Sequence, residues 1–169
     1  MDRWRGRRLA GLAVLALVAA STLLAVALGR DGGAGWIVVR DASGTELARV
    51  ALTPAKSFAM RYRNSVYQSN AEEHFRVEEG QVDLVALAAD ELAVLEEYYA
   101  AIGAIRDRPG STLAWSVGVE RPPIALPLRV QATTLGERTL LVGDGELSLS
   151  RLVAGRDDTL VILTIEGYQ

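Results

Sequence analysis

The sequence contains no cysteine, one histidine and one lysine. The absence of cysteine excludes disulfides, a lipid-modified cysteine, thiolate metal sites and a cysteine nucleophile. The sequence also lacks a Gly-x-Ser-x-Gly elbow, a phosphate-binding loop and a dinucleotide fingerprint. The common hydrolase and nucleotide-binding classes therefore receive no support, and a folded domain must depend on its hydrophobic core alone.

Positive charge is scarce outside the N-terminal segment. The first 30 residues hold five of the 18 basic side chains and one of the 21 acidic ones, which leaves residues 31–169 with 13 basic and 20 acidic side chains, a net charge of −7. Because phosphate binding needs concentrated lysine and arginine, this acidic balance argues against a nucleic-acid partner. Half of all residues are hydrophobic, and about 139 residues suffice for one packed domain.

The N-terminal segment has the pattern of a membrane anchor. Residues 1–8, MDRWRGRR, hold four arginines, and residues 9–28 follow without a charge. Twenty residues in a helix span about 30 Å, which is the thickness of a bilayer core, and the arginines favour a cytoplasmic N-terminus. We therefore expect a single-pass protein of the cell membrane, with residues 29–35 as a tether and residues 36–169 as an extracytoplasmic domain.

A cleaved signal peptide is the competing interpretation of the same segment. Its apolar region usually has about 7 to 15 residues and ends at an A-x-A site. Ala25-Val26-Ala27 matches that site. The length of the apolar run favours the uncleaved anchor, and cleavage after Ala27 remains the alternative.

The remaining sequence predicts an all-β domain, either a sandwich or a barrel. Short alternating or apolar runs recur at intervals of about 8 to 12 residues and are separated by turn residues such as Gly143-Asp144-Gly145. The expected strands are 36–39, 46–52, 57–66, 74–78, 82–87, 112–119, 126–133, 139–142, 147–149 and 159–165.

Residues 90–103, DELAVLEEYYAAIG, fit two structures. Asp90 could cap a helix that buries Leu92, Leu95 and Tyr99 and ends at Gly103. A strand over residues 92–99 is the alternative. We slightly favour the helix-free alternative, because of the family resemblance described below.

The stretch RYRNSVYQSNAEEHF, residues 61–75, predicts a hairpin with its loop at residues 67–71. Alternation places Asn64 and Glu73 on the core-facing side, and we expect them to lie near each other. A carboxylate there needs a donor, which the amide could supply. The pair could fix the hairpin, bind a ligand or take part in catalysis.

The opposite face of that hairpin carries Arg61 and Arg63, with Ser65 beyond them. Two arginines two residues apart on a strand lie side by side and could grip a carboxylate or a phosphate headgroup. A solvated outer face is the alternative. The lone histidine, His74, has the parity of an outward residue, so a Ser65–His74–Glu73 triad is not expected.

No metal site is expected, because the acidic pairs such as Glu72-Glu73 diverge on strands and fit a solubilising role. We predict no cofactor either.

The segment NSVYQSNAEEHF resembles the signature of a bacterial family called domain of unknown function eighteen-fifty. Members show a His-Ser-Val triplet, then a glutamate and an aromatic residue, and later Gly-Ala-Gly. Asn64-Ser65-Val66, Glu73, Phe75 and Gly103-Ala104 correspond to these motifs. Asn64 replaces the histidine, so no acid–base or metal role transfers to it, and Ile105 replaces the last glycine. The family's short β-like segment before Gly-Ala is why we favour a helix-free 92–99.

The resemblance covers most of residues 36–166. The family is often encoded beside TRAP-type transporters of the TAXI class, which implies an accessory role in solute uptake. We therefore expect a non-catalytic accessory or binding module that contacts the bilayer and a transporter membrane subunit or solute-binding protein. A free-standing structural or interaction domain of the envelope, or an enzyme of unrecognised type, are the alternatives.

Overall fold

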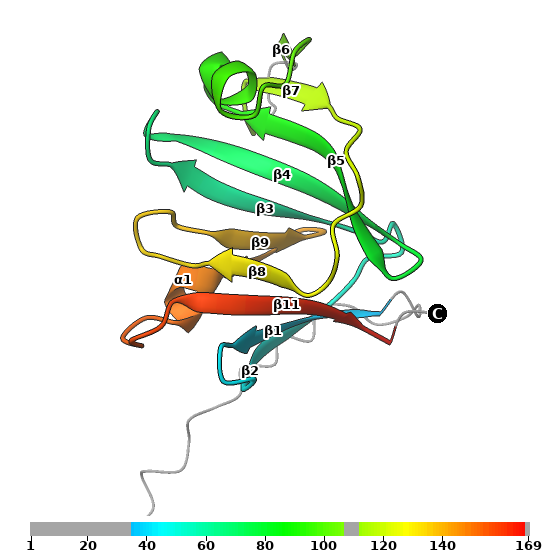
Figure 1. Cartoon of the computed structure of the whole chain (residues 1–169), viewed down its shortest axis with the longest axis vertical. Helices are drawn as coiled ribbons and strands as arrows, with labels where there is room; N and C mark the ends of the chain where they lie inside the picture. Colours follow the sequence, from blue (N-terminus) through cyan, green and yellow to red (C-terminus); the bar gives the residue numbers. More distant parts are fainter. Residues whose placement is uncertain (1–34, 107–111, 168–169) are drawn as a thin grey trace, which may run out of the picture.

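The computed structural model describes residues 35–106 and 112–167 and contains two antiparallel β-sheets, which confirms the all-β prediction. The strands are stacked from β6 and β7 at one end of the molecule to β1 and β2 at the other (Figure 1). The predicted anchor at residues 9–28 lies outside the described residues. Within the two described ranges, no helix has both the length and the apolar character needed to cross a bilayer.

The smaller sheet has four strands in the order β2-β1-β11-β8. Every neighbouring pair is antiparallel, and β8 forms one edge. The side chains of β1 and β11 that point toward the second sheet are apolar, and most of them are buried, namely Ile37, Val39, Val161 and Leu163. The strands are β1 (Trp36–Asp41), β2 (Glu46–Ala51), β8 (Leu128–Gln131) and β11 (Leu160–Glu166).

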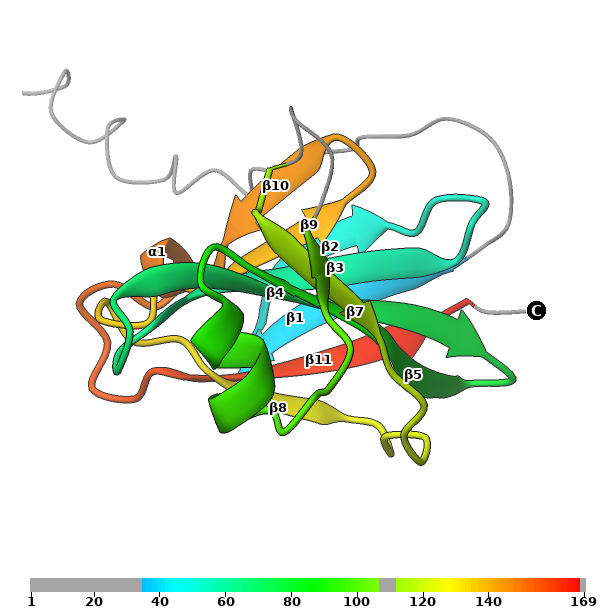
Figure 2. The same ribbon diagram turned by 90° about the horizontal axis from the view of Figure 1, so that it is seen from above.

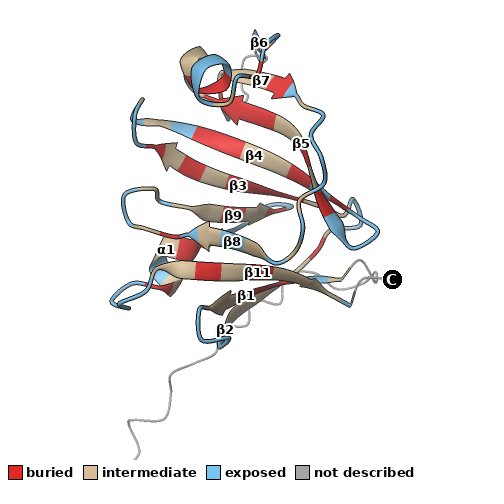
Figure 3. Cartoon of the chain, in the orientation of Figure 1, coloured by how far each residue is buried: buried red, intermediate tan, exposed pale blue. Residues whose placement is uncertain are grey.

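The larger sheet has seven strands in the order β10-β9-β3-β4-β5-β7-β6. It includes the long hairpin β3–β4, in which buried and less buried residues alternate over residues 60–64 and 75–78 (Figure 3). Its strands are β3 (Ser57–Asn64), β4 (Ser69–Glu78), β5 (Gln81–Ala89), β6 (Ile105–Arg106), β7 (Trp115–Gly118), β9 (Thr139–Val142) and β10 (Gly145–Ser148).

One continuous core joins the two sheets. It includes Ile37 and Leu163 from the smaller sheet, and Phe58, Phe75 and Leu140 from the larger one. The Phe58 and Phe75 rings stack with centroids 5.0 Å apart. Burial of such side chains supplies about 1.5–3 kcal/mol each, so the core can stabilise a domain without disulfides.

The helix-free prediction for residues 92–99 is wrong. A short π-helix, η1 (Val94–Tyr98), follows β5 at one end of the sheet (Figure 2). Val94 and Leu95 are fully buried there, so burial of the apolar face decides the conformation. Asp90 does not cap η1, because its Oδ2 instead accepts hydrogen bonds from the backbone and side chain of Asn70.

Two predicted boundaries also differ from the structure. The β3–β4 turn occupies residues 65–68, not 67–71. The predicted strand at 147–149 ends at Ser148, and a single helical turn, α1 (Leu149–Leu152), follows it. Leu149 is fully buried, so this turn packs onto the core.

Candidate functional site: an inter-sheet cleft behind a charged outer face

The β3–β4 turn is organised by Asn64. Its Oδ1 accepts hydrogen bonds from the backbone N–H groups of Val66 (2.9 Å) and Tyr67 (3.1 Å). Gln68, which has a positive φ of 53°, donates from its side chain to the carbonyl of Ser65. An asparagine that accepts from the amides two and three residues later is a standard means of closing a turn. Asn64 therefore has a structural role here, and Ser65 is exposed.

The predicted contact between Asn64 and Glu73 is wrong. In the hairpin register, Asn64 lies opposite Ser69, and Glu73 lies opposite Met60. Four residues along a strand separate the two side chains by about 13 Å. The prediction failed because it began the turn two residues and ended it three residues too late, which shifted the pairing of the two strands.

The outer face of the larger sheet carries a compact charged cluster. Arg61 donates from Nε to Glu72 Oε1 (2.8 Å) and from Nη1 to Glu146 Oε1 (2.9 Å). His74 Nε2 lies 3.2 Å from the other oxygen of Glu72. Only 7 % of Glu72 is exposed, so the prediction that it merely solubilises the chain is wrong. The hydrogen bond from His74 and then the Arg61 guanidinium lower the pKa of Glu72.

Arg61 and Arg63 do share the outer face, but they do not form a matched pair. Arg61 already holds two carboxylates, whereas the guanidinium of Arg63 hydrogen-bonds only to Gln68 Oε1, at 3.2 and 3.3 Å, among the described residues. The Ser65–His74–Glu73 triad is likewise not assembled, since His74 is paired with Glu72 instead.

A shallow depression of about 370 Å³ lies beside this cluster. Its floor is made of small residues, because Ala86 and Ala88 lie opposite His74 and Glu72 in the register of β4 and β5. Leu113 also lines it. The charges at its edge are already satisfied by each other, so the depression offers few unused polar groups to a ligand.

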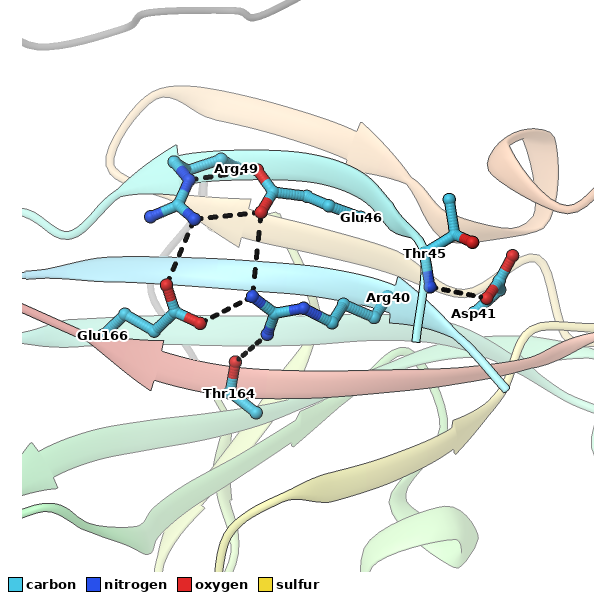
Figure 4. A network of polar contacts seen from close by, with 7 residues as sticks. All are labelled: Arg40, Asp41, Thr45, Glu46, Arg49, Thr164 and Glu166. Atoms are coloured by element: carbon cyan, nitrogen blue, oxygen red, sulfur yellow. Dashed lines mark hydrogen bonds and ion pairs between the residues drawn. The ribbon is translucent and has the colours of Figure 1, made fainter. Parts of the chain in front are cut away.

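The outer face of the smaller sheet carries a second satisfied network (Figure 4). Glu166 accepts from Arg40 Nη2 (2.7 Å) and from Arg49 Nη2 (3.1 Å), and Glu46 also binds Arg49. Thr164 accepts a further hydrogen bond from Arg40. Such a network stabilises the pairing of β1, β2 and β11 and leaves little free charge for recognition.

Glu73 points the other way, into the space between the sheets. The Tyr99 hydroxyl donates to Glu73 Oε1 at 2.7 Å. The Tyr62 hydroxyl lies 2.6 Å from the Tyr99 hydroxyl. Since Tyr99 has one proton and gives it to Glu73, Tyr62 must be the donor to Tyr99. The three groups therefore form a directed chain of hydrogen bonds that ends on the carboxylate.

Both tyrosines in this chain remain protonated at neutral pH. Burial raises the pKa of Tyr62 to about 12. Burial and then the charge of Glu73 raise the pKa of Tyr99 further. The hydroxyls therefore act as hydrogen-bond donors and acceptors, and neither is a general base at physiological pH.

Arg138 completes the inner cluster. Its guanidinium lies over the Tyr62 ring, 4.8 Å from the centroid, and Nη1 is 4.0 Å from Glu73 Oε2. The residue comes from the connection between β8 and β9, far from Glu73 in the sequence. No motif marked Arg138 or Tyr99 as site residues, because only the packing of the two sheets brings them together.

Glu73 and Arg138 of this cluster line a cleft of about 280 Å³. Its volume is close to the lower limit of ordinary small-molecule sites and almost twice that of a cavity that accommodates benzene. The polar members of its lining are Glu73, Arg129, Gln131 and Arg138, and the apolar members are Met60, Phe75, Leu84, Ile124, Leu128 and Val130.

The edge of β8 contributes backbone groups to the cleft. Ala132 donates its N–H to Thr159, next to β11, so alternate residues of β8 direct their peptide groups to the same side. Arg129 and Gln131 therefore direct their N–H and C=O groups to the free edge. In the described part of the chain, β8 is paired with β11 alone, which leaves these groups available.

The inner cluster is suited to binding more than to catalysis. It combines an apolar wall with a few converging polar groups, the usual composition of a ligand site. No group of three or more metal-ligating side chains occurs in residues 35–106 and 112–167. Comparison with known proteins gives no match to any family model, curated protein or solved structure. The resemblance to domain eighteen-fifty thus stays a prediction.

Proposed function

We propose that this chain is a membrane-anchored, extracytoplasmic binding module that works beside a TRAP-TAXI-type solute transporter and has no catalytic activity. The observation that carries the proposal is the inter-sheet cleft, in which an apolar wall meets a polar end with unused donors. Catalysis gains no support from this cluster, because the hydroxyls nearest the carboxylate stay protonated.

The membrane part of the proposal is supported by the sequence. Four arginines followed by 20 uncharged residues fit an anchor whose N-terminus is cytoplasmic. The transporter part is supported by the family resemblance alone, which is an argument by association. A free-standing envelope domain would share the anchor and the cleft but would have no transporter partner.

The decisive experiment purifies the full-length protein from its own membranes in gentle detergent. Mass spectrometry then identifies co-purified proteins and any small molecule released on denaturation. We expect a transporter membrane subunit or a solute-binding protein in stoichiometric amount. Recovery of the chain without an enriched partner would contradict the transporter role and favour the free-standing domain.

A variant with a filled cleft is the matched control. Val130→Phe adds a bulky ring to the lining of the cleft and leaves the outer faces unchanged. We expect this variant to keep the protein partner and to lose the bound small molecule. Reproducible turnover of a substrate that is abolished by Ser65→Ala would instead identify an enzyme and refute the proposal.

A further inference from the structure

Arg138 is held in place without using its hydrogen-bonding capacity. Its charge is positioned by the Tyr62 ring and by Glu73 at 4.0 Å, a distance too long for a hydrogen bond. Among the described residues, no hydrogen bond from its guanidinium is formed, although the group has five N–H donors. About a quarter of the side chain (28 %) is exposed, so these donors are accessible from the cleft.

Glu73, by contrast, is already partly satisfied. One of its oxygens accepts the Tyr99 proton, and the Tyr62 proton is directed toward Tyr99. Arg138 places unused N–H donors beside this single carboxylate, whereas Arg129, whose side chain has the outward parity on β8, contributes its backbone N–H group. Together these groups favour an incoming anion over a cation. A guanidinium with free parallel donors matches a carboxylate in a bidentate arrangement.

The rest of the cleft requires an apolar ligand body. Met60, Phe75 and Leu84 form the wall from the larger sheet, and Leu128 and Val130 form the wall from β8. A volume of about 280 Å³ accepts a short chain or a single ring but not a large cofactor.

We propose that the cleft binds a small organic monocarboxylate, with its carboxylate on Arg138 and its apolar body against Met60 and Phe75. This inference rests on the proposed function, because it names the ligand class of the same cleft. The carboxylate takes the unused donors of Arg138, and the apolar body displaces water from the wall between the sheets.

The two methionines provide a direct test. Met60 lines the cleft, and Met1 is the only other methionine. The full-length chain, labelled with ¹³C-methyl methionine and placed in lipid nanodiscs, is titrated with hexanoate, hexanol and hexylamine in separate experiments. The Met60 methyl signal, assigned with Met60→Leu, reports the cleft, and the Met1 signal, from the N-terminus before the expected anchor, is the reference outside the cleft.

We expect hexanoate to shift the Met60 signal saturably, at least tenfold more tightly than hexanol, and hexylamine to produce no saturable shift. Arg138→Gln should weaken hexanoate at least tenfold and leave hexanol unchanged. Arg76→Gln, which removes one positive charge from the exposed outer face, should change neither affinity. Arg138→Lys keeps the positive charge but lacks the two parallel N–H donors of a guanidinium, so its affinity for hexanoate should be intermediate. An unchanged Met60 signal of each variant without ligand verifies the fold.

The remaining outcomes separate the two proposals. Equal affinity for hexanoate and hexanol, unaffected by Arg138→Gln, would overturn the carboxylate assignment but leave a ligand-binding cleft. Tighter binding of hexylamine would assign the cleft to cations through Glu73 and overturn the inference. No saturable shift with any of the three probes would overturn both the ligand class and the ligand-binding part of the proposed function.

Discussion

Glu72 and Glu73 are adjacent on β4, but they have opposite environments. Glu72 lies on the outer face, is almost fully buried, and is bound by Arg61 and His74. Glu73 lies on the inner side, is about a quarter exposed (24 %), and has one hydroxyl donor and a distant arginine. The difference shows that burial alone does not identify a ligand site. The more buried carboxylate is completely paired and structural, and the less buried one lies beside unused donors.

The largest expected difference between the two regions is in stability. Glu72→Ala should reduce the free energy of unfolding by about 3 kcal/mol, because it removes a buried carboxylate and leaves Arg61 with Glu146 alone. Glu73→Ala should cost about 1 kcal/mol, because water reaches this site and the ion pair is long. Urea denaturation of both variants at neutral pH measures the difference.

Glu78→Ala is the matched control for that pair of variants. Glu78 is on the same strand and is mostly exposed, so its loss should change stability by less than about 0.5 kcal/mol. Equal losses for Glu72→Ala and Glu73→Ala would contradict the distinction between a structural and a ligand-facing carboxylate.

The inner hydrogen-bond chain should give the next largest effect. Tyr99→Phe removes the hydroxyl that donates to Glu73 and accepts from Tyr62. We expect it to lower the free energy of unfolding by about 1–2 kcal/mol. Tyr98→Phe is its control, because Tyr98 is an exposed neighbour on η1 and should tolerate the change. Thermal denaturation compares the two. Similar melting temperatures would place the hydroxyl chain in contact with water.

The lowered pKa of Glu72 predicts a smaller, pH-dependent effect. Since the pKa of this carboxyl is below its ordinary value of 4.5 in the folded state, its ionised form stabilises the protein above that value. That contribution is lost as the pH falls from about 5 through the lower, folded-state pKa. Urea midpoints measured from pH 7 to pH 3 should therefore fall less steeply for Glu72→Gln than for the unmodified chain.

The pH comparison needs the variant because other carboxyls titrate in the same window. Asp41, Glu46 and Glu166 on the smaller sheet also have lowered pKa values, each through a hydrogen bond from a neighbouring side chain. Their contribution is common to both proteins and cancels in the difference. Identical acid profiles would mean that Glu72 does not contribute through its charge.

The strands were the part of the fold most easily predicted. Alternation and turn residues located every main strand, because each side of these sheets meets a different environment. The end of the turn after Asn64 was missed, because the side chains of Asn64 and Gln68 close it without a glycine or proline. The predicted turn began two residues and ended three residues too late, which was enough to predict a contact between Asn64 and Glu73 that the register does not allow.

The candidate site was less predictable than the strands. Alternation correctly placed Glu73 inward and Arg61 outward. It gave no information on Tyr99 or Arg138, because their proximity to Glu73 depends on the packing of η1 and the β8–β9 connection. The helical alternative for residues 90–103 was correct in part, because η1 covers Val94–Tyr98 without the expected Asp90 cap, and the analogy with a family pattern misled the choice. Local propensity backed by a buried face was the better guide.

The smallest expected effect concerns the two outward arginines. Arg61→Gln should lower the free energy of unfolding by about 1 kcal/mol, because Glu72 keeps only His74 as a partner. Arg63→Gln should cost less than about 0.5 kcal/mol, because its side chain contacts one neutral acceptor and its backbone N–H keeps the bond to Gly136. Urea denaturation of both variants measures the difference. If the two losses of unfolding free energy are equal, Arg63 also belongs to the stabilising charged network of the outer face. The structural outer face would then include the β3–β4 turn, and its boundary with the ligand-binding inner cleft would lie elsewhere.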